Sequence, residues 1–112
     1  MKRDRDEIPP GTLDMLILKT LARAPKLHGF QIADAIQQTS EDVLQVEEGS
    51  LYPALQRMLV KGWIEGAWGK TEENRRARFY RLTAAGRKQL AEELERYSRV
   101  SRAIARIVTS EA

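Results

Sequence analysis

The amino-acid sequence predicts a small α+β fold that is mostly helical. Three observations lead to this fold class. Apolar residues recur at helical spacing in three short segments before residue 62, two short segments of alternating polarity follow, and a long segment of helical periodicity comes last. With 112 residues, of which 42% are hydrophobic and 31% charged, the chain has a globular composition and is long enough for one core.

Two short helices are predicted over residues 12–23 and 29–39, because each segment carries a single apolar stripe. Thr12 is placed to cap the first of them, and Pro25 ends it. Residues 1–10 are charged and then proline-paired, so we expect a flexible arm in front of the first helix.

A third helix is predicted over about residues 51–61. Ser50 is a candidate cap, and Pro53 fits a first turn, where the backbone N–H groups lack intrahelical partners. Gly62 stands where a left-handed residue commonly ends a helix. The preceding segment, residues 40–50, is expected to be a short linker with at most a helical turn.

Residues 63–68 and 78–83 read as two strands, because aromatic, basic and apolar residues partly alternate in them. Between them, residues 69–77 are polar and contain turn formers, so the two strands form a hairpin. Three short helices followed by such a hairpin predict a winged helix-turn-helix with a two-stranded wing.

The last helix is predicted from Ala84, capped by Thr83, to about Val108. Those roughly 25 residues span about 38 Å. Its apolar residues follow one another in steps of three and four, with Ser101 in one slot, which is a heptad-like seam. A core this small does not bury the whole seam, so the seam predicts a homodimer. We therefore expect a winged helix-turn-helix domain over residues 11–83 and a dimerisation helix over 84–112.

Several classes of protein are excluded by composition. The chain has no cysteine, which rules out disulfides, a thiolate nucleophile and a cysteine-held zinc site. His28 is the only histidine, and we expect it to support the start of the second helix rather than catalyse a reaction. The longest apolar run, 15–18, is far short of the roughly 20 residues that span a bilayer. We therefore expect a cytoplasmic protein without metal or cofactor that is not an enzyme.

The net charge of +3 maps to one segment. Residues 61–81 hold six basic and three acidic side chains, while the rest of the chain is balanced. The plain interpretation is a solvated loop. The functional one is a wing whose Arg and Lys side chains neutralise DNA phosphates or enter the minor groove.

The third helix carries a polar or small face that suits DNA recognition. Arg can make two hydrogen bonds to guanine and Gln two to adenine, and small polar groups suit phosphate near a helix start. An ordinary amphipathic helix with a wet face remains the alternative, because periodicity does not separate the two. The residues of this face are Ser50, Tyr52, Pro53, Gln56, Arg57 and Lys61.

Four segments together resemble the short form of the PadR family of transcriptional regulators, in the type abundant in acidobacteria. They occur in the family's order and spacing and cover nearly the whole chain from Gly11 on. The segments are GTLDMLIL at 11–18, HGFQIADAIQQ at 28–38, EEGSLYPALQRMLVKGWI at 47–64 and NRRARFYRLTAAGRKQL at 74–90.

The resemblance implies a dimeric winged helix-turn-helix protein that binds an inverted-repeat operator in double-stranded DNA and usually represses transcription. It implies that the polar face of the third helix contacts the major groove. The implied wing contacts are Lys70, Arg75 and Arg76. The implied dimer contacts are Leu13, Leu16, Ile17, Leu90, Leu94, Tyr97, Ile104 and Val108.

In some members of the family, aromatic side chains of the last helix line a dimer cleft that accepts flat aromatic compounds. The resemblance therefore implies a small aromatic effector as a further partner. This chain departs from close relatives at Tyr97, where they tend to carry Trp.

Two other functions stay open at this point. The winged helix could serve as a protein-interaction module, because a fold does not fix a function. The chain could also be primarily a sensor of small aromatic ligands. Absence of duplex binding at low salt would favour the first alternative, and thermal shifts with planar aromatic compounds would favour the second.

Overall fold

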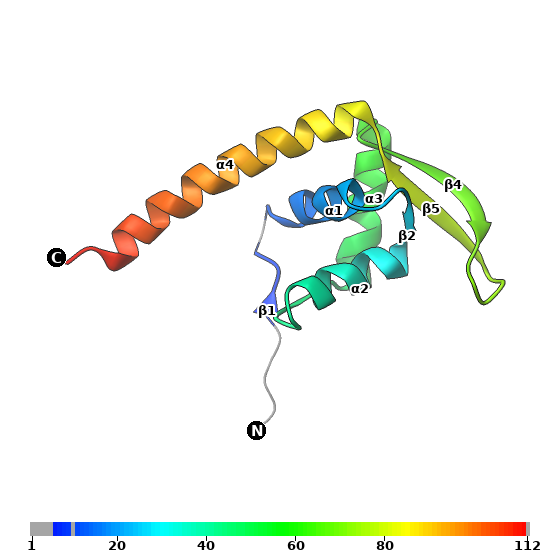
Figure 1. Cartoon of the computed structure of the whole chain (residues 1–112), viewed down its shortest axis with the longest axis horizontal. Coiled ribbons are helices and arrows are strands. Elements are labelled where there is room, and N and C mark those ends of the chain that lie inside the picture. The colour runs from blue at the N-terminus through cyan, green and yellow to red at the C-terminus, as the bar shows by residue number, and fades with distance from the viewer. Residues whose placement is uncertain (1–5, 10, 112) are drawn as a thin grey trace, which may run out of the picture.

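Three helices form the body of the structure, a computed structural model that describes residues 6–9 and 11–111. They are α1 (Leu13–Ala22), α2 (Gly29–Thr39) and α3 (Glu48–Lys61). A hairpin of β4 (Ile64–Lys70) and β5 (Arg76–Leu82) extends from this body, and α4 (Ala84–Thr109) leaves it in the other direction (Figure 1). Three two-residue strands complete the chain: β1 (Asp6–Glu7), β2 (Leu27–His28) and β3 (Leu44–Gln45).

One hydrophobic core holds the three helices and the base of the hairpin together. Burying each large aliphatic side chain contributes about 1.5–3 kcal/mol relative to leaving it exposed. The helical stripes seen in the sequence therefore act as the faces that meet in this core. The largest fully buried side chains are Ile17, Leu18, Leu21, Ile32, Leu51, Leu55, Met58 and Ile64.

The predicted helix boundaries are confirmed for α2 and nearly so for α1, but α3 begins earlier than expected. The carbonyl of Glu47 accepts hydrogen bonds from the N–H groups of Ser50 and Leu51, so the helix starts at residue 48. Ser50 therefore lies inside the helix and is not its cap, and Pro53 lies beyond the first turn. At the other end, Gly62 has a φ of 78° and ends the helix as predicted.

The linker before α3 contains a strand that the sequence did not indicate. Leu44 and Gln45 pair in parallel with Asp6 and Glu7. The described part of the expected arm is therefore not free, because its backbone groups bond to β3. Residues 1–5 and 10 of that arm lie outside the described residues.

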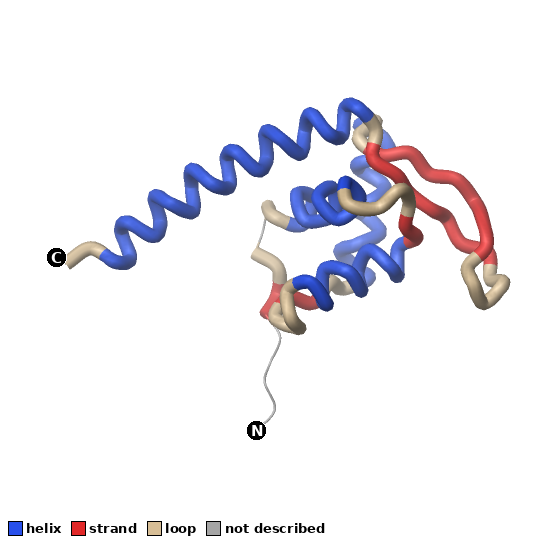
Figure 2. Tube along the Cα trace, viewed as in Figure 1, coloured by secondary structure: helices blue, strands red, loops and turns tan. Residues whose placement is uncertain are grey.

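The wing is confirmed as an antiparallel hairpin whose register runs from Ile64 opposite Leu82 to Lys70 opposite Arg76. Both strands extend further toward the tip than predicted. A third strand, β2, pairs with the other edge of β5, so the hairpin is anchored as a three-stranded sheet at its base (Figure 2). The predicted α+β, mostly helical fold with a winged helix-turn-helix is therefore confirmed.

The start of α4 is fixed tightly to the base of the wing. The Thr83 hydroxyl accepts a hydrogen bond from the Gly86 N–H at 3.0 Å and donates one to the Gly62 carbonyl at 2.6 Å, which confirms Thr83 as the cap. A Cβ on Gly86 would lie 2.0 Å from the Trp63 carbonyl oxygen, so only glycine allows this approach. The N-terminal half of α4 runs along α1, and its C-terminal half extends past the body.

Candidate nucleic-acid interface

One face of the wing starts in the core and ends in a row of cations. Ile64 and Tyr80 are buried at its inner end. Because side chains alternate between the faces of a sheet, Lys70, Arg76 and Arg78 all lie on this same face, which we call the inner wing face. From the body outward, its register pairs are Ile64 with Leu82, Gly66 with Tyr80, Trp68 with Arg78 and Lys70 with Arg76.

The two faces of the wing carry opposite charge arrangements. On the outer face, Arg81 stands directly across from Glu65 and forms an ion pair with it at 2.8 Å. On the inner face, Lys70 stands across from Arg76, and no acidic residue of strands β4 and β5 shares that face. Like charges directly opposite are destabilising in a sheet. The inner wing face therefore has the charge arrangement of an anion-binding surface.

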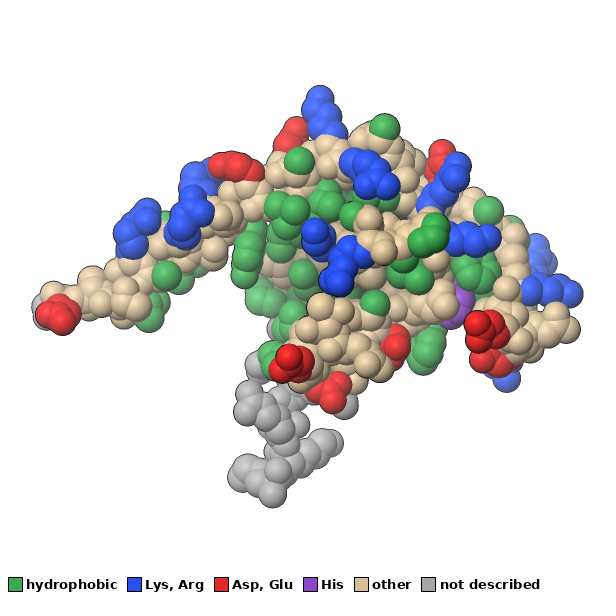
Figure 3. All heavy atoms as spheres, viewed as in Figure 1, with side chains coloured by type: hydrophobic (Ala, Val, Ile, Leu, Met, Phe, Trp, Pro, Cys, Tyr) green, Lys and Arg blue, Asp and Glu red, His purple; other side chains and the backbone are tan. Residues whose placement is uncertain are grey.

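An aromatic side chain supports this row of cations. The guanidinium of Arg76 stacks over the Trp68 ring, 4.5 Å from its centroid. Such a contact orients the guanidinium while its N–H groups remain available to an anion. In Figure 3 the cations gather along the wing, with acidic side chains beside them near the tip. Arg75, another predicted wing contact, is exposed in the turn.

The predicted recognition residues of α3 are all exposed: Ser50, Tyr52, Pro53, Gln56, Arg57 and Lys61. They do not all point the same way. The Tyr52 ring leans on the start of α2, where a Cβ at Gly29 would lie 2.8 Å from its hydroxyl oxygen. Lys61 lies over the Trp63 ring at 4.7 Å. Tyr52 and Lys61 therefore contact other parts of the same chain, and Pro53 and Gln56 are exposed between them on α3.

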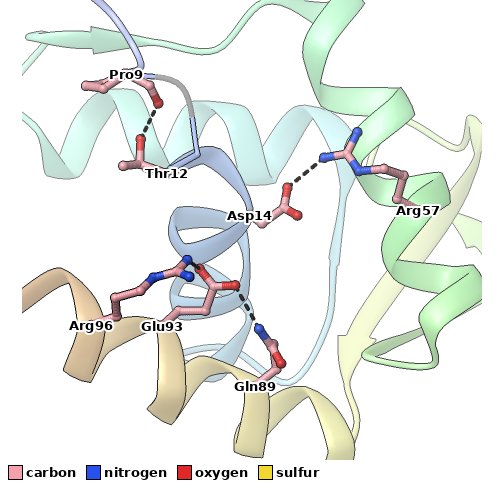
Figure 4. A network of polar contacts seen from close by, with 7 residues as sticks. All are labelled: Pro9, Thr12, Asp14, Arg57, Gln89, Glu93 and Arg96. Carbon is pink, nitrogen blue, oxygen red and sulfur yellow. Dashed lines mark hydrogen bonds and ion pairs between the residues drawn. The ribbon is translucent and has the colours of Figure 1, made fainter.

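Arg57 has a partner that the sequence did not indicate. Its guanidinium forms an ion pair with Asp14 of α1 at 2.8 Å (Figure 4). The Arg57 side chain remains 56% exposed, so the pair orients the guanidinium without hiding it. An exposed pair of this kind is worth at most about 1 kcal/mol. The predicted guanine-reading residue is thus tethered to α1 by a weak bond.

Sequence reasoning missed three residues of this surface. Val60 is 78% exposed one turn after Gln56, and an apolar side chain there can contact a thymine methyl group. Its position outside the apolar stripe of α3 is the signal that could have found it. Trp68 and Arg78 belong to the inner wing face, and strand alternation around the predicted contact Arg76 could have found both.

Two of the residues predicted for the dimer interface belong to the core of the chain itself. Ile17 is fully buried and Leu90 is 7% exposed, so neither offers surface to a second chain. The reason is that the first turns of α4 pack on α1 within the same chain. Leu13 and Leu16 are partly buried. The exposed apolar side chains of α4 are Leu94, Tyr97, Val100, Ile104, Ile107 and Val108, two of which, Val100 and Ile107, were not predicted.

A hollow of about 150 Å³ lies where the middle of α4 passes the start of α1. Tyr97 and Val100 line it from α4, and Thr12 and Met15 line it from α1. Glu93 and Arg96, an ion pair at 3.7 Å, border the same space, and Glu93 also accepts a hydrogen bond from Gln89 (Figure 4). The hollow combines an aromatic wall with charged groups.

His28, the only histidine, has a structural role. His28 precedes α2, where its N–H donates to the Gln31 side chain at 3.0 Å, and its ring meets Phe79 edge to face at 5.3 Å. Over residues 6–9 and 11–111 there is no cluster of three His, Cys, Asp or Glu side chains that could hold a metal ion. Across the same residues, every helix is too short or too polar to cross a membrane.

The comparisons with known proteins agree with this architecture. The model of the transcriptional regulator PadR-like family matches residues 17–92. A transcriptional regulator from Clostridium thermocellum is 25% identical, with a TM-score of 0.80 over 88% of this chain and 95% of its own. A PadR-like transcriptional regulator from Bacillus cereus is 26% identical, with a TM-score of 0.76 over 90% of this chain and 95% of its own.

A curated relative, "Uncharacterized protein X" from Lysinibacillus sphaericus, is 28% identical over 100 residues, which are 89% of this chain and 91% of that protein. The family model spans the second and third helices, the wing and the start of α4, which are the elements that build the surface described above. The matched family consists of transcriptional regulators and not of enzymes. The family model matches more than half of the residues of this chain, and the chain therefore belongs to the PadR-like family of transcriptional regulators.

Proposed function

We propose that this protein is a sequence-specific regulator that binds double-stranded DNA as a homodimer and represses transcription from an inverted-repeat operator. The observation that carries the proposal is the inner wing face, where Lys70, Arg76 and Arg78 stand without an acidic neighbour on their face. One strand of this face, β4, follows α3 directly in the chain and packs on it. Arg and Lys in such a row neutralise backbone phosphates, while Gln56 and Arg57 suit base edges.

The exposed apolar residues of α4 support the homodimer. Several large side chains of its C-terminal half are at least half exposed, including Ile104 and Val108. A contiguous apolar face on a regulator of this size indicates an interaction surface. A second copy would supply a matching face by two-fold symmetry and would place two recognition helices on half-sites about 34 Å apart.

Selection of bound duplexes from a random pool tests the proposal. We expect the enriched sequences to contain an inverted repeat with half-sites about one helical turn apart. Anisotropy titrations of a selected duplex at several salt concentrations should then give a linear fall of log affinity with log salt. A protein that enriches no sequence and binds no duplex at low salt would contradict the proposal.

A matched pair of variants tests the role of the wing. Arg76→Gln removes a cation of the inner face, whereas Arg81→Gln removes a cation that is already paired with Glu65 on the outer face. We expect Arg76→Gln to weaken binding to all duplexes and to reduce the salt slope by about 1. Equal effects of the two variants would count against the inner face as the DNA surface.

The hollow beside Tyr97 supports a small aromatic effector as a second, regulatory partner. Tyr97 offers a flat ring and a hydroxyl at the point where α4 passes α1. Thermal shifts with a panel of planar aromatic compounds, compared between the wild type and Tyr97→Ala, test this role. The absence of any shift across the panel would remove the effector from the proposal.

A further inference from the structure

We propose that Arg78 is an additional DNA-binding residue, whose guanidinium lies against Gly66 in the wing and binds a backbone phosphate beside α3. The inference rests on the proposed DNA-binding function and deepens it. Arg78 belongs to the basic segment 61–81, but it is not among the individual wing contacts, Lys70, Arg75 and Arg76, that the resemblance implied. It lies one register pair inward from Lys70 and Arg76 on the inner wing face.

The first observation is that Arg78 lacks an acceptor. Its Nε is buried and has no hydrogen-bond partner. No ion pair or hydrogen bond of its side chain occurs within residues 6–9 and 11–111. Two other arginines near the same surface are engaged, Arg57 with Asp14 and Arg81 with Glu65. Arg78, like Lys70 and Arg76 on the same face, therefore keeps donors for a group from outside, and it is the one of these three with a buried unpaired nitrogen.

The second observation is the space made for the Arg78 side chain. A Cβ at Gly66, on the neighbouring strand, would lie 2.6 Å from Arg78 Nε and 3.2 Å from its Cζ. Any side chain at residue 66 would therefore push the guanidinium out of its position. The glycine at this point of β4 leaves a space, which we call the cradle, in which the guanidinium lies against the strand.

Among the residues that the structure describes, no acidic side chain forms an ion pair with the Arg78 guanidinium. The neighbouring Tyr80 is buried, and burial raises its pKa, with Arg78 partly opposing that shift, so its hydroxyl is neutral at physiological pH. Glu65 lies on the opposite face of the wing in its pair with Arg81. Burying a polar atom of a cation without an acceptor costs free energy. The terminal nitrogens of the same guanidinium are not among the buried atoms, so an external anion can accept hydrogen bonds from them and neutralise the charge.

The position of the cradle identifies the anion as a DNA phosphate. Arg78 belongs to the same row as the cations of the wing, and its guanidinium lies against Gly66 of β4, the strand that follows α3 and packs on it. The guanidinium therefore lies at the angle between the recognition helix and the wing. A duplex that contacts both elements brings its backbone past this angle. The planar guanidinium matches two phosphate oxygens at once.

Three variants test the inference in the full-length chain: Arg78→Gln, Arg78→Lys and Gly66→Ala. The probes are a duplex selected from a random pool and an unrelated duplex of the same length. We expect Arg78→Gln to bind both duplexes about 10- to 100-fold more weakly, as a charge-assisted hydrogen bond implies, and to reduce the salt slope by about 1. Arg78→Lys keeps the charge and should retain the slope.

Gly66→Ala leaves the arginine in place but closes the cradle. We expect it to weaken binding to both duplexes as Arg78→Gln does. Arg81→Gln is the matched control and should change affinity less than about threefold, because its charge is already paired. Gly66→Ala also provides the test if Arg78→Gln fails to fold.

Melting of the free protein separates a DNA contact from a structural role. Because Arg78 has no partner in the free chain, Arg78→Gln should leave the melting temperature within about 2 °C of the wild type. If the wild type binds the selected duplex and both Arg78→Gln and Gly66→Ala keep its affinity and salt slope, the inference is wrong while the proposed function stands. If the wild type binds no duplex at low salt, the proposed function fails first.

Discussion

At the scale of single residues, the protein holds its candidate DNA-binding side chains by weak, exposed contacts. Arg57 pairs with Asp14, Arg76 stacks over Trp68 and Lys61 lies over the neighbouring Trp63 ring. Each contact is worth about 1 kcal/mol or less at an exposed site. These contacts limit the conformations of the three side chains in the free protein, and breaking them on DNA binding costs little free energy.

The pair between Arg57 and Asp14 gives a prediction for DNA affinity. Arg57 gives up this pair if it turns toward a base, so Asp14→Asn should strengthen binding by up to about fivefold. Anisotropy titrations of Asp14→Asn, Arg57→Ala and the double variant measure the coupling. The gain should vanish in the Arg57→Ala background. An equal gain in both backgrounds would mean that Asp14 acts through its charge alone.

Tyr80 gives a prediction for stability at high pH. Burial raises its pKa above the ordinary value of 10.0, so the folded chain holds the proton more tightly than the unfolded chain does. The resulting stabilisation is fully present below about pH 10 and is lost as the pH rises through the folded pKa. Urea unfolding between pH 8 and 11 should show a steeper loss for the wild type than for Tyr80→Phe. Parallel curves would contradict this.

At the scale of elements, the helix ends were predictable and the short pairings were not. α2, the glycine that ends α3 and the Thr83 cap follow local rules that a sequence displays. β1, β2 and β3 are two-residue strands whose partners lie far away in the chain, so nothing local specifies them. The early start of α3 likewise depends on its tertiary context.

In the candidate site, too, properties of one continuous segment were predictable, and contacts between distant segments were not. The exposure of the polar face of α3 and the basic character of the wing were predictable, because each is a property of one continuous segment. The tether of Arg57 joins residues 43 apart in sequence, and the cradle of Arg78 depends on strand register. The burial of Ile17 and Leu90 was missed because helical periodicity does not tell which apolar face meets which partner.

Replacing either of two helical glycines, Gly49 and Gly86, by alanine should change the free energy of unfolding in opposite directions. In a helix, Ala is favoured over Gly by about 1 kcal/mol. Gly49→Ala should therefore stabilise the chain by up to that amount, because nothing lies within 4 Å of the added Cβ. Gly86→Ala should destabilise it by about 1–3 kcal/mol, because the Cβ meets the Trp63 carbonyl. Urea unfolding of both variants decides. Stabilisation by Gly86→Ala would refute the close packing of α4.

At the scale of the whole molecule, the shape is elongated, with extents of 58 × 41 × 22 Å. The wing projects from one end and the apolar half of α4 from the other (Figure 1). The proposed DNA surface and the proposed dimer surface are thus carried by opposite parts of the chain. A variant in one surface should leave the other intact.

The dimer surface gives the corresponding prediction. Ile104→Asp should place an unpaired charge in the proposed interface and shift sedimentation toward the monomer. Its affinity for a selected duplex should fall, because the two half-sites would be bound separately. Arg102→Asp, a charge change on the polar side of α4, is the control and should leave the dimer intact. An unchanged sedimentation of Ile104→Asp would rule out this face as the interface.

The junction at Thr83 has a geometric consequence for a dimer. There the end of α3, the base of the wing and the start of α4 are tied together by the Thr83 hydroxyl and the missing side chain of Gly86. A helix of 26 residues is about 39 Å long, so a tilt of about 5° at this junction moves its far end by about 3 Å. That displacement is close to the rise of one base pair, about 3.4 Å. The tight junction at Thr83 and Gly86 thereby limits which operator spacing two joined copies would span.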